Sequence, residues 1–255
     1  MQDRSALRIG CVKYLNARPL IWGWKGEVVF DDPTTLCRQL SEGALDVAFV
    51  SSFEFLQNPI YSIVHGISIS SNGPVYSVVV AHRHDLRSIK EIALDPASTT
   101  SANLLRILLP EFGLNARLVS KSKSVTTPPE AQLLIGDQAI RFRRDHPEFS
   151  FWDLGTAWKE KFDVPFVYAL WLIRPEIADK AISGQLRSLR DHNLDNLESL
   201  ITAEKDFDHD FCSRYYREYL RFEFGEPEKE GLRRFNDLCA KHGLVPSRPL
   251  SLSLA

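Results

Sequence analysis

Strand-like apolar runs alternate with helical patterns from the start of this chain, and no other feature constrains its fold as strongly. The predicted strands are residues 7–14, 28–30 and 45–50, and the predicted helix is residues 34–43. Thr34 and Thr35 follow Pro33 and are expected to cap that helix. Strands that alternate with helices form βαβ units, so we expect a largely parallel sheet.

A second alternating set begins after the turn Asn72-Gly73-Pro74. Its predicted strands are residues 75–81, 89–94, 116–119 and 131–135, and its predicted helices are residues 101–109 and 138–144. One more apolar run follows at residues 164–172, and the pattern is helical from Pro175 onward. Amphipathic helices owe their stability mainly to packing, so we expect this last third to return to the first lobe.

These patterns together predict an α/β fold with two lobes, two crossover strands and a central ligand cleft. Lobe 1 is expected to comprise residues 1–78 and 170–255, and lobe 2 residues 79–169, with crossover strands at about 76–82 and 164–171. Two lobes joined in this way typically close around a ligand.

Composition limits the class of partner. The 31 basic and 33 acidic residues give a net charge of -2, which is not the basic surplus of a nucleic-acid binder. Residues 1–9 lack the features of a signal peptide, and no apolar run approaches the roughly 20 residues that span a bilayer. We therefore expect a cytoplasmic protein with a small-molecule ligand and with neither a nucleic-acid nor a membrane partner.

Cysteine and histidine spacing gives no metal signal. The cysteines are Cys11, Cys37, Cys212 and Cys239. They contain no Cys-x-x-Cys pair, and the seven histidines show no ligand spacing. We expect four buried, reduced thiols and no metal site.

Polar residues follow two of the predicted strands, at the ends where open α/β sheets bind ligands. The sequence Tyr14-Leu15-Asn16 leaves an amide side chain at the end of the first strand, although Asn is also a common turn residue. At Ser51 and Ser52 a buried strand gives way to a helix. The free N–H groups and hydroxyl there either bind a carboxylate or serve only as a helix cap.

Hydroxyl side chains also mark the next segments. Ser68, Ser70 and Ser77 alternate with β-branched residues, and this polar face lines the cleft or faces solvent. The pair Thr100 and Ser101 lies at a predicted helix start and is the clearest anion-site candidate, with an N-cap as the alternative.

Glycine and charged residues complete the set of candidates. Gly136 follows a strand and would let a ligand approach the backbone, while Asp137 either acts in the site or caps a helix. Arg141, Arg143 and Arg144 are expected on a solvated helix face. The run Arg214-Tyr215-Tyr216-Arg217 has helical spacing that favours amphipathic packing over nucleic-acid stacking.

Several short motifs occur in a characteristic order between about residues 7 and 174. They are Tyr14-Leu15-Asn16 with Pro19-Leu20, Leu45-Asp46-Val47-Ala48, Gly73-Pro74-Val75 with Ser77-Val78, Thr100-Ser101, Leu134-Ile135-Gly136-Asp137, and Asp153-Leu154-Gly155 with Trp158 and Pro165-Phe166-Val167. In this order they resemble the menaquinone-biosynthesis dehydratase family called MqnA, whose members look like type II periplasmic binding proteins that have become enzymes. The helical remainder adds little to the resemblance.

The resemblance implies chorismate dehydratase activity, a lyase reaction of the futalosine route to menaquinone. Chorismate would lose its ring hydroxyl and a neighbouring ring proton to give 3-[(1-carboxyvinyl)oxy]benzoate. The substrate has two carboxylates, which the helix starts at Ser52 and at Thr100 and Ser101 would hold. Because loss of water makes the ring aromatic, the resemblance implies no cofactor and no metal. The protein would act as a monomer or homodimer.

Roles for individual residues are hypotheses drawn from this resemblance. Asn16 and Ser77 would orient the ring and the departing oxygen, while the enolpyruvyl carboxylate of the substrate takes the proton. Asp137 is the rival base. The substrate-binding residues would be Tyr14, Ser52, Ser70, Thr100, Ser101 and Gly136.

Three positions depart from the family pattern. Thr99 stands where an arginine is common, Tyr76 where a basic or amide residue is common, and Ser51 where proline is common. Arg18 either replaces the missing cation or is an ordinary surface arginine.

Three other functions remain open. The chain could be a non-catalytic binding protein for a small carboxylate, because a fold does not fix a function. It could be the sister enzyme MqnD, 1,4-dihydroxy-6-naphthoate synthase, although Tyr14-Leu15-Asn16 and Gly73-Pro74-Val75 favour the dehydratase. An effector-binding lobe of a transcription factor would need a helix-turn-helix segment ahead of the first strand.

Overall fold

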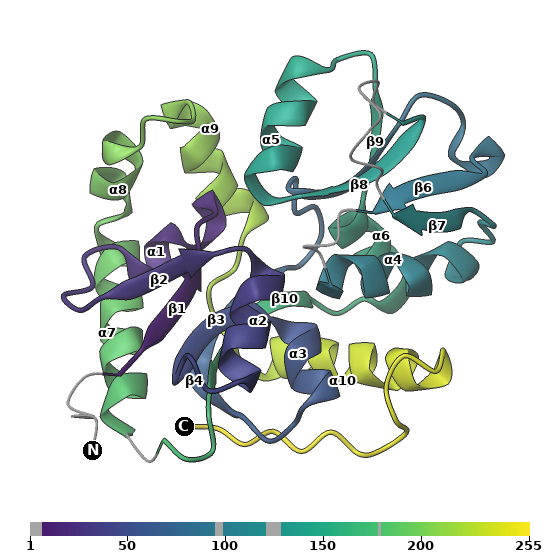
Figure 1. The fold of residues 1–255 in the computed structure, drawn as a ribbon. Coiled ribbons are helices and arrows are strands. Elements are labelled where there is room, and N and C mark those ends of the chain that lie inside the picture. Colours follow the sequence, from purple (N-terminus) through teal and green to yellow (C-terminus); the bar gives the residue numbers. More distant parts are fainter. Residues whose placement is uncertain (1–6, 95–98, 121–128, 178–179) are drawn as a thin grey trace.

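A computed structural model describes residues 7–94, 99–120, 129–177 and 180–255. Within these residues the strands form two five-stranded sheets, which Figure 1 shows as separate layers. The first sheet has the order β2-β1-β3-β10-β4 and the second β7-β6-β8-β5-β9. This arrangement confirms the predicted α/β class and the prediction of two sheets.

The first sheet contains the N-terminal strands and one strand from later in the chain. Its strands are β1 (Ile9–Val12), β2 (Val28–Asp31), β3 (Val47–Ser51), β4 (Ser62–Ser71) and β10 (Phe166–Ile173). Strand β1 is parallel to both β2 and β3, whereas β10 runs antiparallel to β3 and β4. The carboxyl ends of β1 and β3 therefore meet at one edge, as βαβ units require.

The second sheet repeats this mixed pattern. Its strands are β5 (Val78–His82), β6 (Glu91–Leu94), β7 (Arg117–Ser120), β8 (Ala131–Ile135) and β9 (Ser150–Asp153). Strand β6 is parallel to β7 and β8, while β5 is antiparallel to β8 and β9.

Short helices follow most strands, and longer ones form the last third of the chain. The helices are η1 (Leu15–Ala17), α1 (Arg18–Ile21), α2 (Pro33–Ser41), α3 (Ser52–Gln57), η2 (Leu86–Ser88), α4 (Thr99–Glu111), α5 (Gly136–Asp145), α6 (Leu154–Phe162), α7 (Lys180–Asp195), α8 (Leu197–Ala203), α9 (His209–Arg214), the π-helical turn η3 (Tyr215–Tyr219) and α10 (Glu226–Lys241). Helix α7 contacts α1 and β4, and α10 contacts β10 and α4. The C-terminal helices α7 and α10 thus pack against strands of the first sheet, and α10 also contacts α4 (Figure 1).

The cap of α2 differs from the prediction. Asp32, rather than Thr34 or Thr35, is the N-cap, and its Oδ1 accepts a hydrogen bond from the Thr35 N–H at 3.0 Å. The expectation was wrong because the N–H groups that need an acceptor belong to the first helical turn. An acceptor side chain must therefore precede Pro33.

Two chain segments connect the sheets, and one carboxylate joins them. The chain leaves β4 at Ser71 and enters β5 at Val78, then returns through α6 to β10. The Asp153 carboxylate caps α6 and also accepts from the N–H groups of Val75 and Tyr76, the latter at 2.8 Å. This carboxylate fixes the outgoing segment against the returning one.

The return strand lies earlier than the expected lobe boundary. Strand β10 pairs with β4 from Phe166 onward, so residues 166–169, which we assigned to lobe 2, hydrogen-bond within the first sheet. We retain the residue boundaries of the two lobes as a proposal, with the return placed before Phe166.

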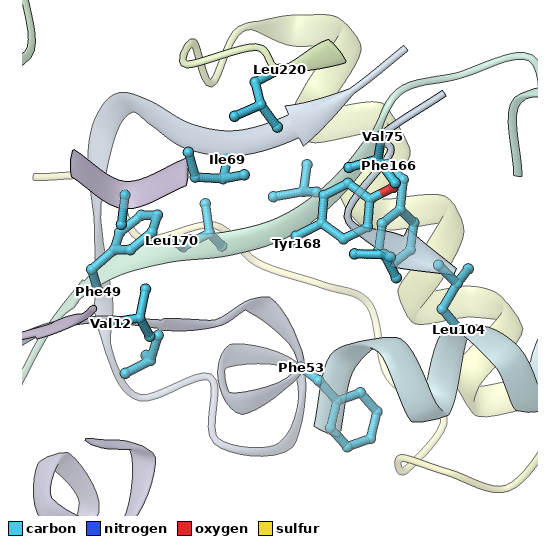
Figure 2. Packing of buried hydrophobic residues seen from close by; sticks show 14 of the residues in the cluster. Val12, Phe49, Phe53, Ile69, Val75, Leu104, Phe166, Tyr168, Leu170 and Leu220 are labelled. Atoms are coloured by element: carbon cyan, nitrogen blue, oxygen red, sulfur yellow. The ribbon is translucent and has the colours of Figure 1, made fainter. Parts of the chain in front are cut away.

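One hydrophobic cluster extends from the first sheet into α4. Figure 2 shows Phe49, Leu170, Tyr168 and Phe166 of the first sheet, Val75 of the connecting segment and Leu104 of α4, all members of this cluster. Phe166 and Leu104 are fully buried. Because the core is continuous here, the two sheets are held together by burial as well as by the chain connections.

Candidate functional site

A cavity lies between the two sheets at the carboxyl ends of β1 and β3. About 590 Å³ in and around it is free of protein atoms, part of this open to solvent. Six of the predicted site residues line it: Tyr14, Asn16, Ser77, Thr100, Ser101 and Gly136. Among the described residues of its lining there is no Asp, Glu, His, Lys, Arg or Cys. The described part of the lining therefore offers amide, hydroxyl and backbone groups, but no charged side chain.

Asn16 lies in the 3₁₀ turn η1, directly after β1. Its Oδ1 is buried and has no hydrogen-bond partner among the described residues. The turn is held from both sides, because the Leu15 N–H donates to Asp137 Oδ1 at 2.8 Å and the Tyr216 hydroxyl donates to the Leu15 carbonyl at 2.9 Å. A buried amide oxygen without a partner, on a fixed turn, is suited to bind a polar ligand, since leaving it unpaired costs free energy.

Ser77 reaches the cavity from the segment before β5. It is fully buried, and its Oγ accepts a hydrogen bond from the Tyr215 hydroxyl at 2.6 Å. Its carbonyl accepts from the Gly136 N–H at 2.8 Å. The Ser77 side chain is thus held by a residue that lies more than half the chain further on.

The side chain of Thr100 hydrogen-bonds mainly to residues at the end of β3 and the start of α3. Its Oγ1 hydrogen-bonds with the Ser51 hydroxyl and accepts from the Phe53 N–H at 3.2 Å. It therefore satisfies an N–H in the first turn of α3, a role usually taken by a preceding residue. Ser101, beside it, also lines the cavity. The loop residues 95–98, which complete the predicted anion site, lie outside the described part of the chain.

Three candidate serines, Ser52, Ser68 and Ser70, lie away from this lining. The Ser52 hydroxyl donates to the Val167 carbonyl at 2.7 Å. Ser70 pairs through its backbone with Arg221, and Ser68 donates to the Glu223 carbonyl. The polar face of β4 therefore meets the C-terminal segment rather than the cleft. The sequence pattern could not distinguish these two surfaces, because both suit alternating serines.

The structure shows why position 136 requires glycine, which the sequence did not reveal. The φ of Gly136 is +55°, and an added Cβ would lie 3.0 Å from Cγ of the Tyr14 ring. Glycine is needed for this left-handed backbone conformation and for the close contact with the ring. The contact brings the start of α5 against the turn after β1.

Asp137 lines a neighbouring charged hollow rather than the cavity itself. The residues of this hollow are Lys13, Tyr14, Arg18, Ile135, Asp137, Gln138, Arg141 and Asp206. Burial raises the pKa of the Asp137 carboxyl above its usual value, although the Leu15 N–H bond opposes the shift. Its observed contact is with the backbone of η1, which carries Asn16.

The arginines near the site have other partners. Arg18 pairs with Glu204 and, at 3.4 Å, with Asp206. The guanidinium of Arg143 lies 4.0 Å from the centroid of the Tyr76 ring and donates to the Tyr76 carbonyl. The expectation of a solvated face was therefore wrong for Arg143, because the ring and carbonyl of Tyr76 attract the cation.

Tyr215, Tyr216 and Asp153 are the residues that our assignment of site roles missed. The two tyrosines were correctly expected to pack within an amphipathic segment, and both are buried. Their hydroxyls could have indicated a further role, because the O–H of a buried tyrosine usually donates to an acceptor in the protein. Asp153 was visible in the motif Asp153-Leu154-Gly155, but the backbone N–H groups that it binds are brought to it only by the fold.

The described residues contain no cluster of three or more His, Cys, Asp or Glu that could hold a metal ion. All four cysteines are free, and Cys37 is only partly buried. Within the same residues, none of the helices is both long and apolar enough to cross a membrane.

Comparison with known proteins identifies the relatives of this chain. The model of a family described as menaquinone biosynthesis matches residues 7–241. Chorismate dehydratase of Thermus thermophilus is 29% identical over 253 residues, covering 89% of this chain and 93% of the relative. Chorismate dehydratase of Campylobacter jejuni is 24% identical, with 89% and 90% covered.

Solved structures support the fold alone. A Candida albicans protein described as having the generic periplasmic binding protein structural fold superposes with a TM-score of 0.67. It is 11% identical and the match covers 98% of this chain and 96% of that one. The chain therefore has the two-lobed, periplasmic-binding-protein-like fold that its motifs predicted.

Proposed function

The chain belongs to the menaquinone biosynthesis family, and from this premise we propose that it is a chorismate dehydratase, a carbon-oxygen hydro-lyase of the futalosine route. Chorismate loses one water and becomes 3-[(1-carboxyvinyl)oxy]benzoate. The observation that carries the proposal is the cavity between the sheets, whose described lining is uncharged and includes the Ser77 hydroxyl and the unpartnered amide oxygen of Asn16. Relatives with this activity align over most of the chain.

The balance of the reaction suits such a cavity. A ring C–H bond breaks and its electron pair forms the new ring double bond, while the neighbouring C–O bond breaks and hydroxide departs. The proton and the hydroxide together make the water that is released. Because the product ring is aromatic, the driving force lies in the substrate. The protein has to orient the substrate and stabilise charge as it moves.

Asn16 and Ser77 are the residues to which we assign this orientation. The Asn16 amide has both an acceptor and a donor end, and Ser77 has a hydroxyl that already accepts from Tyr215. Donors fixed in a buried site stabilise a departing oxygen because they need not reorganise. One such donor is worth about 2.7 to 4 kcal/mol, or a factor of about 10² to 10³ in rate.

The enolpyruvyl carboxylate of the substrate takes the ring proton in this mechanism. The lack of an Asp, Glu or His among the described lining residues supports an internal base. Asp137, the rival, is engaged with the Leu15 N–H and lines the neighbouring hollow. We assign it the role of holding the Asn16 turn.

One carboxylate of the substrate is bound by neutral hydrogen bonds at the start of α4. Helix α4 starts at the cavity, and the N–H groups of its first turn, which have no partner within the helix, favour an anion together with Thr100 and Ser101. The Tyr14 ring and Gly136 complete the binding surface beside them. We place the reaction in the cytoplasm, which the free cysteines support.

The first test is an assay of the purified protein with chorismate, without added metal or nucleotide. Mass analysis should find a product lighter by one water that co-elutes with 3-[(1-carboxyvinyl)oxy]benzoate. Intact chorismate that binds tightly would instead support a non-catalytic carboxylate-binding protein. If chorismate is neither bound nor converted, this result would contradict both of these functions and would favour the sister enzyme, 1,4-dihydroxy-6-naphthoate synthase.

A further inference from the structure

Two neighbouring tyrosines of the C-terminal region reach the two substrate-facing segments. The Tyr215 hydroxyl donates to Ser77 Oγ at 2.6 Å, and the Tyr216 hydroxyl donates to the Leu15 carbonyl at 2.9 Å. Tyr215 is fully buried and Tyr216 is 2% exposed. Both therefore act from the protein interior, behind the cavity rather than inside it, and neither belongs to its lining.

The local backbone lets both hydroxyls point toward the site. Residues Tyr215–Tyr219 form a π-helical turn, whose wider winding reduces the angle between successive side chains. Such turns are rare and occur frequently at functional sites. The Tyr215 ring is also stacked on Phe211, with centroids 5.5 Å apart and planes at 17°. The ring position, and with it the position of the hydroxyl oxygen, is thereby fixed by packing.

The hydrogen bond from Tyr215 determines what Ser77 can do. A serine hydroxyl has one proton to donate and two acceptor lone pairs. With Tyr215 donating to Ser77 Oγ, the serine proton is free to be donated elsewhere. Ser77 lines the cavity, and among the described residues Tyr215 is the side chain that its Oγ contacts by a hydrogen bond. The direction left for the serine proton is the cavity.

Tyr215 itself does not serve as an acid. Burial raises the pKa of its hydroxyl well above the usual value, so it keeps its proton throughout the neutral range. A chain of two hydroxyl donors is also mutually polarised, which strengthens the outer hydrogen bond.

We propose that Tyr215 is a positioning residue that orients the Ser77 hydroxyl toward the departing oxygen of the substrate, and that Tyr216 holds the turn that carries Asn16. This role rests on the proposed dehydratase function. Through the hydroxyl groups of Tyr215 and Tyr216, the C-terminal region would thus contribute to the reaction.

The test is a double-mutant cycle between Tyr215→Phe and Ser77→Ala, measured with chorismate. Tyr215→Phe keeps the ring and removes only the hydroxyl. We expect kcat to fall about 10-fold, the effect of one hydrogen bond of about 1.4 kcal/mol, with KM changed less than about 2-fold. In the Ser77→Ala background the same change should have almost no effect on kcat, because the group it orients is gone.

Tyr219→Phe is the matched control. Tyr219 lies in the same π-helical turn, and its hydroxyl accepts from Arg214 at 3.0 Å, at the surface. Its removal should leave kcat and KM unchanged. Circular dichroism and thermal unfolding of each variant check that the fold is retained.

The outcomes separate the inference from the proposed function. If wild-type protein dehydrates chorismate but Tyr215→Phe lowers kcat equally with and without the Ser77 hydroxyl, the positioning role is overturned and the function stands. Full activity in Tyr215→Phe would overturn it as well. A wild-type protein that leaves chorismate intact overturns the proposed function and, with it, this role.

Discussion

Two neighbouring hollows share Tyr14 and Ile135 in their walls and differ completely in charge. The cavity that contains Asn16 and Ser77 has no charged residue in its described lining. The adjoining hollow contains Lys13, Arg18, Asp137, Arg141 and Asp206. Among the described residues, the comparison places charged side chains beside this cavity but outside its lining, where they can position or attract a substrate.

The sharpest test of this division is Asn16→Ala, in the uncharged cavity. We expect kcat to fall by about 10² to 10³, because an oriented amide is lost from a buried site. Thermal stability should hardly change, since the Asn16 Oδ1 has no described partner to lose. Near-normal turnover, measured by product formation, would contradict the assignment of the reaction to this cavity.

Gly136→Ala changes the wall between the two hollows. The φ of +55° and the Tyr14 ring at 3.0 Å both oppose a side chain. We expect a loss of about 1 to 3 kcal/mol in the free energy of unfolding, together with weaker chorismate binding. Denaturant unfolding and calorimetric titration measure the two effects, and Gly113→Ala is a suitable control. Gly113 also has a positive φ, but no atom lies within 4 Å of its added Cβ.

Asp137→Asn tests the charged hollow directly. An amide oxygen can still accept from the Leu15 N–H, so the Asn16 turn should stay in place. We expect kcat to fall less than about 10-fold, whereas loss of a general base typically costs about 10² to 10⁴. A loss in that larger range, with the variant folded, would make Asp137 the base and would remove the contrast between the two hollows.

The same carboxyl should make stability depend on pH. Its pKa is raised in the folded state, so its contribution is fully present below the unfolded pKa and is lost as pH rises through the folded value. The difference in melting temperature, wild type minus Asp137→Asn, should therefore decrease between about pH 4 and pH 7. A difference that increases over this range would mean that the Leu15 hydrogen bond outweighs burial.

Lys13→Gln should have the smallest effect. Lys13 is exposed at the charged hollow, where a cation attracts a dianionic substrate. We expect kcat/KM to fall about 2-fold at low salt and to match wild type at about 0.5 M salt, where surface charges are screened. An equal loss at both salt concentrations would indicate direct contact with the substrate.

Much of the fold could be predicted because it depends on local patterns. Apolar periodicity and helix-start residues indicated the first strand, predicted at 7–14 and found at Ile9–Val12. They also indicated a helix at 101–109, found as Thr99–Glu111, and the helical last third. The prediction of site residues failed where the same sequence pattern suits two different surroundings. Ser70 and Ser77 both alternate with β-branched neighbours, yet Ser70 pairs with Arg221 and Ser77 faces the cavity.

The sequence alone determined which residue types stand at the strand ends, because the order of residues along the chain places particular side chains directly after each apolar run. It thereby indicated the family, the two sheets, and Asn16 and Ser77 as candidates. Only the tertiary structure decided which hydroxyls meet. Tyr215 reaches Ser77 across 138 positions in the chain. No local propensity encodes such a contact, since it requires both sheets and the C-terminal helices to be packed first.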